Sequence, residues 1–519
     1  MSQSKETKTQ SRAEREEKRR QEERADRRTM ALYTLVGVVV VVAAVVLLVW
    51  NSGILQRTLT AVEVDGVKYT AADVEYYYNS AYNQIVNTYM NQYYSTPFDT
   101  SISTEKQVYD EETGQTWHDY LMESALANLT HDTALAAQAE AAGHTLSQET
   151  QDELDAALVQ LDTGWISYGY ANRDAFIRAS YGSHMTYDRL VELFQRQALA
   201  GDWAQDQLDA IAYTDEEYEA YYEENADLLD TYTLSQFLIQ ARVETTDEDG
   251  NAIEMTDEEK AAALEEAKAE REPLVQELRE RLEAGEDPAA LAEEYADDLY
   301  LSSVSVLVAG SSFSGYPYAD WAMEAGRTAG DVTVEESESA TSCLYYVVLF
   351  EGRERDDTPA ADVRHILVAA EQDEGADQPT QAQYDAAYAE AEALLDQWKA
   401  GEATEDSFAA LAQENSADTG SAANGGLISN ISAASGYVDT FADWALDPAR
   451  QPGDTGIVQN TGSSTKGWHI MYYVSAGDPI WKQTAFSALQ SEDYDQLLAD
   501  IDGSVTAQQG LGMRFVSAR

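Results

Sequence analysis

The sequence has a single cysteine, Cys343, among 519 residues. One cysteine excludes an intrachain disulfide, so the folded chain must be stabilised by packing. Cys343 is also far from the apolar segment near the N-terminus, which excludes a lipid-modified cysteine beside that segment. Its neighbours are mainly apolar and typical of a strand, so we expect Cys343 to be a small buried side chain.

Basic residues are also scarce: 33 Lys and Arg stand against 94 Asp and Glu, a formal net charge of −61. Residues 1–29 hold ten of the basic residues and seven acidic ones, so the remainder carries −64. A nucleic-acid-binding surface needs clustered Lys and Arg, and we expect no nucleic-acid partner. The acidity has two interpretations, solubility (including adaptation to salt) or attraction of basic unfolded polypeptides.

Long apolar runs are lacking except at residues 30–55, which carry no charge. A run of this length can span the membrane hydrocarbon as a helix. The basic tail of residues 1–29 would then remain in the cytoplasm. Because the flank from Trp50 to Arg57 does not resemble a signal-peptide cleavage site, we predict an uncleaved anchor. The expected protein crosses the cell membrane once and has an extracytoplasmic bulk.

A helical domain is predicted over residues 60–230. It opens with a hairpin, in which residues 60–69 alternate apolar and polar side chains around an Asp65-Gly66 turn. Apolar and aromatic residues then recur at helical spacing. Ser147 and Thr214 are followed by acidic residues, a pattern typical of helix starts.

Two copies of one α+β domain follow, each with an opening strand, two helices, a loop region and a closing strand. Matching segments occur in the same order, which indicates an internal duplication. These segments are 282–286 with 398–402, 291–294 with 411–414, 319–322 with 442–445, and 346–348 with 471–473. The predicted domains are 231–354 and 360–478, and residues 479–519 are expected to be a partly helical C-terminal segment.

Only six histidines occur, and two of them, His365 and His469, lie in the first and last predicted strands of the second copy. A lone histidine in a strand is usually a hydrogen-bonded core residue. Two histidines on neighbouring antiparallel strands could instead share a hydrogen bond. The other four histidines are scattered among helices without the spacing of converging metal ligands, so we expect no metal site.

The second copy resembles the parvulin class of peptidyl-prolyl cis/trans isomerases. The segments that carry the resemblance are 364–368, 408–412, 416–418, 420–422, 425–426, 452–454 and 467–470, together with Phe441. The resemblance implies an antiparallel sheet with surrounding helices and no cofactor. By position in the motifs, it assigns catalytic roles to His365, Asp418 and His469.

The same resemblance implies a proline pocket formed by Phe441 and Tyr437, with Val438 beside them. Two positions depart from the family pattern: Leu427-Ile428-Ser429 follows the glycine pair, and Val438 replaces a commonly polar residue. The first copy places Phe237 at the position of His365, Leu344 at that of His469 and Tyr318 at that of Phe441. Since both imidazoles are lost, we expect the first copy to be a degenerate, inactive parvulin-like domain.

The helical region resembles, more loosely, the chaperone part of PrsA-like and SurA-like foldases. The function implied is a membrane-anchored extracytoplasmic foldase whose partners are unfolded or newly exported polypeptides. Two alternatives stay open: a holdase that binds clients without useful turnover, and a cell-envelope scaffold with stable partners. The sequence leaves the oligomeric state open.

Overall fold

The computed structural model describes residues 30, 34–45, 48, 52–246, 253–373, 376, 378–460, 462 and 465–517. It divides into two compact units. The helical unit comprises the described residues up to Ile211 together with those from Glu492 onward, and the sheet unit comprises Ala212–Ser491. Each unit has its own cores of buried side chains.

Two predictions are corrected by the structure. One is the transmembrane anchor, and the other is the single-pass location with an extracytoplasmic bulk, which depended on that anchor. Within the part of the chain that the structure describes, every helix is too short or too polar to cross a membrane. Crossing takes about 20 consecutive apolar residues, and the described helical run at residues 34–45 falls short of this. The predicted cytoplasmic tail, residues 1–29, and residues 31–33, 46–47 and 49–51 of the predicted span lie outside the described residues. The fold is a mixture of helices and sheets without a spanning element among those described.

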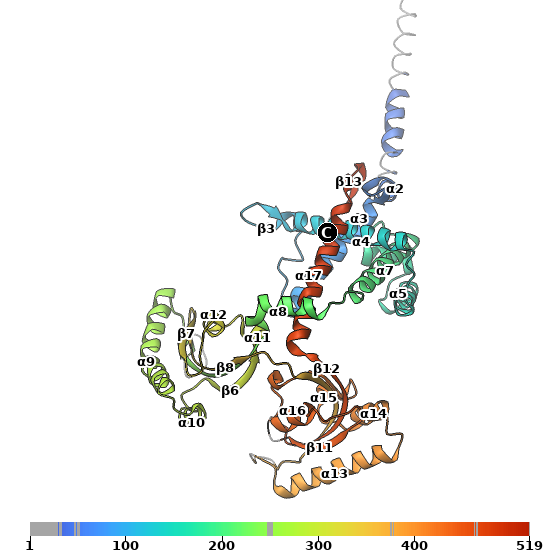
Figure 1. The fold of residues 1–519 in the computed structure, drawn as a ribbon. Helices are drawn as coiled ribbons and strands as arrows, with labels where there is room; N and C mark the ends of the chain where they lie inside the picture. The colour runs from blue at the N-terminus through green and yellow to red at the C-terminus, as the bar shows by residue number, and fades with distance from the viewer. Residues whose placement is uncertain are drawn as a thin grey trace, which may run out of the picture. The chain divides into compact units, whose positions relative to one another are not determined.

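The helical unit packs its helices against a small three-stranded antiparallel sheet (Figure 1). Its strands are β1 (Thr60–Val64), β2 (Val67–Thr70) and β13 (Ala507–Gln509), in the order β13-β1-β2. Its helices are α2 (Ile54–Thr58), α3 (Ala71–Tyr93), α4 (Trp117–Ala142), α5 (Gln148–Ser167), α6 (Arg173–Tyr181) and α7 (Tyr187–Asp209). Shorter elements are η1 (Thr104–Lys106), β3 (Val108–Asp110), β4 (Gln115–Thr116) and η3 (Leu511–Phe515).

Local sequence signals account for how these elements begin. The predicted hairpin is confirmed, since Val64 pairs with Val67 around Asp65 and Gly66, both of which have positive φ as a tight hairpin turn requires. The helix starts predicted at Ser147 and Thr214 are also confirmed. Each side chain accepts a hydrogen bond from a backbone amide of its own helix, which satisfies one of the free N–H groups at the helix N-terminus.

The described residues from Glu492 onward complete the helical unit. Helix α17 (Ile480–Ser504) is followed by β13, whose residues pair antiparallel with β1. The buried Glu75 carboxylate then accepts hydrogen bonds from the backbone amide and the hydroxyl of Ser517, at 3.1 and 2.6 Å. Strand pairing and a buried carboxylate thus both hold the end of the chain to the core of this unit.

The sheet unit begins with α8 (Asp215–Leu229) and contains two four-stranded antiparallel sheets (Figure 1). The first has the order β6-β5-β8-β7. Its elements are β5 (Thr231–Arg242), α9 (Asp257–Glu283), α10 (Pro288–Glu294), β6 (Leu301–Ala309), α11 (Gly310–Phe313), α12 (Ala319–Met323), β7 (Val332–Ser339) and β8 (Ser342–Glu354). Cys343, in β8, is buried as expected.

The second sheet has the equivalent order, β10-β9-β12-β11. Its elements are β9 (Pro359–Ala369), α13 (Gln381–Ala400), α14 (Glu405–Asn415), α15 (Thr419–Ala422), β10 (Leu427–Ile431), η2 (Ala433–Ser435), α16 (Asp439–Ala445), β11 (Thr455–Asn460) and β12 (Gly467–Pro479). Successive residues of a strand point to opposite faces. One face, with Ile366 and Ile470, packs on α13 and α14, and the other, with Val363 and Met471, packs on α16.

Candidate active site

Two histidines meet on the α16 face of the second sheet. In the pairing of β9 with β12, Leu367 lies opposite His469 and Met471 lies opposite His365, so both imidazoles project from the same face of neighbouring strands. Their Nδ1 atoms are 3.0 Å apart. The shared hydrogen bond that the sequence suggested is therefore present, and both rings are buried.

Asp418 approaches the same pair from the segment before α15. Its Oδ2 lies 2.9 Å from His365 Nε2. The segment is held against β9 because Ala417 N donates to the Leu367 carbonyl at 2.8 Å and Leu367 N donates to Ser416 Oγ at 3.1 Å. Backbone contacts thus bring Asp418 to the histidines from a distant part of the sequence.

Ser421 is a fourth member of this network, and the sequence analysis did not assign it a role. Its hydroxyl donates to Asp418 Oδ2 at 2.6 Å, and its oxygen lies 2.9 Å from His365 Nε2. Ser421 is buried. Its position three residues after Asp418, at the start of a short helix, is the signal that could have identified it, because a residue at this spacing lies beside a helix-capping side chain.

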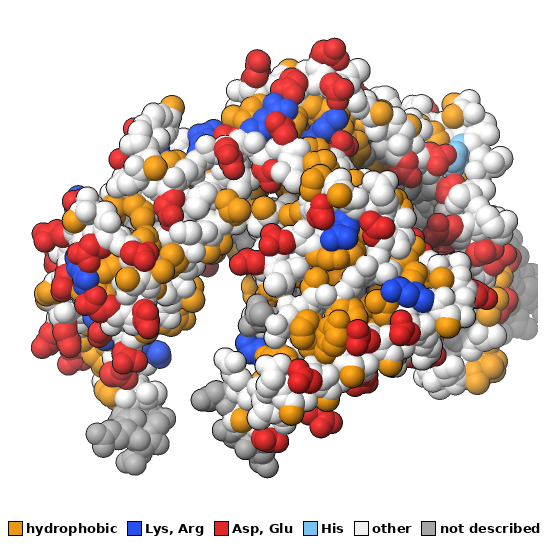
Figure 2. Space-filling view, turned by 60° about the horizontal axis from the view of Figure 1, so that its bottom comes forward, with side chains coloured by type: hydrophobic (Ala, Val, Ile, Leu, Met, Phe, Trp, Pro, Cys, Tyr) orange, Lys and Arg blue, Asp and Glu red, His pale blue; other side chains and the backbone are white. Residues whose placement is uncertain are grey.

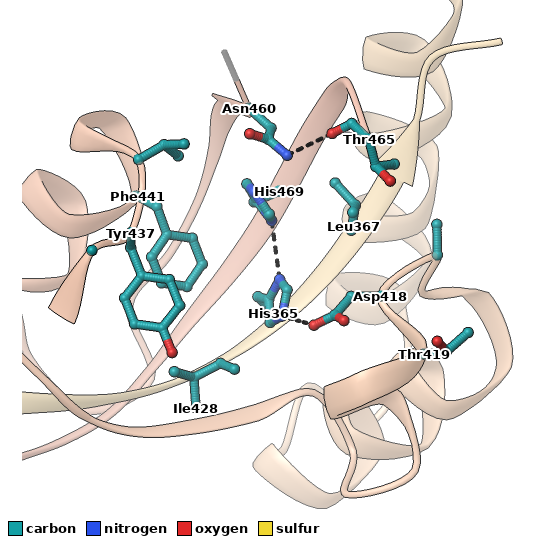
Figure 3. Close-up of a pocket in the computed structure, with 13 residues that line it drawn as sticks. His365, Leu367, Asp418, Thr419, Ile428, Tyr437, Phe441, Asn460, Thr465 and His469 are labelled. Carbon is teal, nitrogen blue, oxygen red and sulfur yellow. Dashed lines mark hydrogen bonds and ion pairs between the residues drawn. The ribbon is translucent and has the colours of Figure 1, made fainter. Parts of the chain in front are cut away.

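The hydrogen bonds specify the protonation of both rings. A carboxylate can only accept, so His365 Nε2 carries the proton that is donated to Asp418. His365 Nδ1 is then the acceptor, and His469 Nδ1 donates to it. This chain of donors runs from His469 through His365 to Asp418 (Figure 3) and leaves His469 Nε2 without a proton.

Burial keeps both histidines neutral. Desolvation lowers the pKa of His469 to about 3, with a further lowering from His365. Desolvation also lowers the pKa of His365, against the opposing effect of Asp418. The pKa of Asp418 is lowered because the Ser421 hydroxyl, His365 and the Gly420 amide together outweigh its partial burial. At neutral pH the site therefore contains two neutral imidazoles and one carboxylate.

A cavity of about 430 Å³ opens beside the histidine pair. The Phe441 ring packs edge-on against both imidazoles, with ring centroids 5.1 Å from His469 and 5.5 Å from His365. The Tyr437 ring lies 5.1 Å from Phe441 and is partly exposed, and Val438 also lines the cavity. All six residues chosen from the sequence therefore surround one cavity, with the aromatic pair on one side and Asp418 on the other (Figure 3).

Other lining residues were not anticipated from the sequence. These are Leu367, Ala417, Thr419, Ile428, Gly436, Asn460 and Thr465. Most of them lie in loops or at strand ends, where periodicity carries no information about which side chain faces a cavity. Asn460 donates a hydrogen bond to the Thr465 carbonyl at 2.7 Å, which ties β11 to the loop before β12.

The glycine pair before β10 is explained by its close approach to His365. The His365 amide donates to the Gly426 carbonyl at 2.8 Å. Gly426 has a φ of +70°, and a Cβ at this position would lie 2.1 Å from the His365 carbonyl oxygen. Leu427, one of the departures from the family pattern, follows directly. It is the first residue of β10 and pairs with Arg364 of β9. The departure leaves the approach of this loop to His365 intact.

The first copy differs from the prediction in one assignment. Strand pairing places Tyr346, the counterpart of Met471, opposite Leu238, so Leu238 is the structural equivalent of His365. Phe237 lies one residue earlier and therefore points to the other face, where it packs in the core with α9. Tyr318 packs on Tyr346 at 5.8 Å between centroids and bonds Gln236 through its hydroxyl at 2.9 Å. Neither Leu238 nor Phe237 is a histidine, so the first copy lacks the imidazole of His365 with either residue as its equivalent.

Among the described residues, one group has ligand atoms close enough to hold a metal ion: Glu336, Glu338 and Cys343. Lys268 already occupies this group, with its Nζ 3.0 Å from Glu336 and 2.7 Å from Glu338. The pKa of the Cys343 thiol is raised to about 11 by burial first and then by Glu336, so the thiolate that a metal would need is disfavoured.

The family comparison identifies the second copy. Residues 365–475 match the model of the PPIC-type peptidyl-prolyl isomerase domain, known as the rotamase family. The chain carries a peptidyl-prolyl isomerase domain. The matched range includes both histidines, Asp418, Ser421 and the aromatic pair, so the cavity described above lies inside the isomerase domain.

Solved structures similar to the chain include several proteins named PrsA. PrsA from Bacillus subtilis is 13% identical, with 80% of this chain and 92% of that chain covered and a TM-score of 0.24. PrsA from Bacillus anthracis is 19% identical over 28% of this chain, which spans 58% of that chain, with a TM-score of 0.18. Sequence identities and TM-scores this low give no information about function. The functional conclusion depends on the match of residues 365–475 to the isomerase family. No curated protein matches the chain.

Proposed function

We propose that His365, His469 and Asp418 form the catalytic group of the isomerase domain and that Phe441, Tyr437 and Val438 hold the substrate proline. The observation that carries this proposal is the hydrogen-bonded chain His469-His365-Asp418 beside the cavity on which Phe441 packs. A flat aromatic ring next to a small cavity suits the apolar pyrrolidine ring of proline.

The reaction explains why so few polar groups are needed. Rotation about an X-Pro bond has a barrier of about 20 kcal/mol, and no covalent bond is made or broken. Twisting the amide removes its resonance, which localises the nitrogen lone pair and shortens the carbonyl. A partly dry cavity that binds this twisted state more tightly than the planar one lowers the barrier. The neutral imidazoles and Asp418 fix the polarity around the substrate carbonyl without charging or covalently modifying it.

The test is isomerisation of a proline peptide by the full chain. We expect acceleration over the uncatalysed rate. Phe441→Ala should reduce kcat/KM by about tenfold or more, since it removes a buried aromatic contact with the substrate. His469→Ala should reduce kcat/KM because it breaks the hydrogen-bond chain. Tyr316→Ala is the matched control, because Tyr316 is a partly exposed aromatic residue in the first copy. No acceleration by the unaltered chain would refute the enzymatic proposal.

We further propose that the helical unit binds unfolded polypeptides, so that the chain acts as a foldase. Residues 76–98 contain no Asp, Glu, Lys, Arg or His, although 24% of the chain is charged. Three side chains at the C-terminal end of α3 are exposed: Met90, Tyr93 and Tyr94. An uncharged stretch of chain with exposed aromatic side chains suits contact with unfolded segments. Newly exported chains, the clients inferred from sequence, remain one class to test.

A holdase without turnover is the second candidate, because the same α3 surface could act alone. Aggregation suppression that survives both Asp418→Ala and His365→Ala, together with absent isomerisation, would favour the holdase. A scaffold would instead co-purify with folded partners at fixed stoichiometry. These measurements separate the three functions with the same protein preparations.

A further inference from the structure

The isomerase cavity carries a net negative charge. Among the described residues that line it, Asp418 is the single one with a formal charge at neutral pH. The pKa of each histidine is lowered by burial, so neither ring contributes a positive charge. The pKa of Tyr437 is raised by burial and by Asp418, so its hydroxyl stays protonated. Any charge on a bound peptide is therefore in the field of one carboxylate.

The Asp418 carboxylate is partly exposed, and its two oxygens have different partners. Oδ2 of Asp418 is bonded to His365 and Ser421, whereas Oδ1 accepts a hydrogen bond from the Gly420 amide at 3.1 Å. The Asp418 side chain is 34% exposed. It lies at the edge of the cavity opposite Phe441, beside the exposed Thr419 (Figure 3).

Two basic side chains of this domain, Arg364 and Arg450, are engaged elsewhere. Arg364 precedes His365 and so points to the opposite face of the sheet, where it bonds Glu405 at 2.9 Å. Arg450 stacks on the Trp444 ring, 4.4 Å from its centroid, and pairs with Asp447 at 3.4 Å. The chain as a whole is acidic, with a formal net charge of −61, and Figure 2 shows more red than blue side chains on the face that it draws. Local and long-range fields thus have the same sign.

We propose that this cavity selects X-Pro segments in which the residue before proline is Lys or Arg, and that it disfavours Asp, Glu and phosphoserine there. The inference rests on the proposed function, in that the X-Pro bond is bound beside Asp418. A cation near a partly desolvated carboxylate gains Coulomb energy, and an anion loses as much. Asp418 thereby selects substrates in addition to its contact with His365.

The first test uses the full unaltered chain and peptides that differ only in the residue before proline: Lys, Ala or Glu. We expect kcat/KM to fall in that order, with Lys about tenfold above Glu, and the ratio to shrink as salt is added. Equal values for the three peptides, or a preference for Glu, would overturn the inference while leaving the isomerase function intact. Failure to accelerate any of the three would instead overturn the proposed function.

The second test moves the charge without touching Asp418. Thr419 is exposed at the start of α15, so Thr419→Lys places a cation beside the carboxylate on a surface that tolerates it. We expect the Lys-to-Glu ratio to fall toward one. Thr419→Gln adds similar length without charge and should keep the original ratio. A ratio that Thr419→Lys leaves unchanged would show that the preference does not come from Asp418.

Discussion

His365 and His469 differ from most histidines in that their neutral form is built into the fold. Each ring nitrogen in the chain from His469 to Asp418 has one defined role as donor or acceptor. Adding a proton to His365 would place two donors face to face at the Nδ1 contact, in a buried setting, whereas His469 would take a proton on Nε2 against the cost of desolvation. His365 therefore resists protonation by geometry as well as by desolvation, and His469 resists it mainly by desolvation.

This resistance predicts a flat pH profile. Because burial lowers the pKa of His469 to about 3 and lowers that of His365 as well, we expect kcat/KM at about pH 5 to be within about twofold of that at about pH 7.5. An exposed histidine with a pKa of about 6.5 would lose most of its neutral form over that range. The measurement is the rate for an uncharged proline peptide across the range. A single-proton decline centred near pH 6.5 would contradict it.

The same shifts affect stability with a definite sign. A histidine whose folded pKa lies below its unfolded value of about 6.5 binds more protons when unfolded, so stability rises with pH between the two values. For His469 the contribution is complete above about pH 6.5 and is lost as pH falls toward about 3, by up to about 1.4 kcal/mol per pH unit, and His365 acts in the same direction. The lowered pKa of Asp418 acts only at lower pH, because its unfolded value is already about 4.

The elements around the site depend on one tight loop. Gly426→Ala should destabilise the isomerase domain, since the positive φ alone costs about 1–2 kcal/mol and the new Cβ would lie 2.1 Å from the His365 carbonyl oxygen. Displacement of His365 should also reduce isomerisation. The measurements are the urea midpoint and kcat/KM of the full chain.

Gly436→Ala is the matched control for this loop. Gly436 has a φ of +72°, close to that of Gly426, and no atom lies within 4 Å of a Cβ built there. Its variant should therefore show only the backbone cost in the urea midpoint. If the two variants were equally stable, the close approach of β10 to His365 would not matter.

Elements with local sequence signals could be predicted, but the faces of strands could not always be. The Asp65-Gly66 turn and the starts at Ser147 and Thr214 follow from residues within one turn of each other. The equivalence of Phe237 with His365 failed by one residue, because the side chains of a strand alternate and only pairing with β8 sets the register. A motif match between the two copies does not give the register of a strand unless every loop has the same length in both.

The site residues that belong to the family motif were predicted from the sequence. The residues that only folding brings to the site were missed. His365, His469 and Phe441 are read from strands and a helix whose order is that of a known family. Thr465 reaches the cavity through a loop, and Ser421 reaches His365 from the short helix α15. The positions of such segments depend on contacts distant in sequence. The predicted anchor at residues 30–55 was inferred from hydropathy alone, and the described helices there do not reach spanning length.

At the scale of the whole molecule, the proposed client surface and the isomerase cavity belong to different units of the chain. Met90 and Tyr93 lie on α3 of the helical unit, whereas Phe441 lies on α16 of the sheet unit. Substitutions at sites that share no interaction partners act additively. The two activities should therefore be separable by mutation in one full-length protein.

We expect Met90→Ser with Tyr93→Ser to weaken suppression of aggregation of an unfolded client by about fivefold, since truncating a contact residue of this kind costs about 1 kcal/mol or more. Isomerisation of a short proline peptide should be unchanged. Phe441→Ala should give the converse result. The two assays on the same preparations, light scattering and peptide isomerisation, measure both outcomes.

A control within the same unit distinguishes a specific surface from general apolarity. Val159 and Ile166 on α5 are as exposed as Tyr93, but the helix that carries them also carries acidic residues, including Asp155 and Asp162. Val159→Ser with Ile166→Ser should leave aggregation suppression intact, because nearby carboxylates already disfavour apolar segments there. Equal losses in both double variants would mean that any exposed apolar side chain of this unit serves. The uncharged stretch from Tyr76 to Phe98 would then have no special role in client binding.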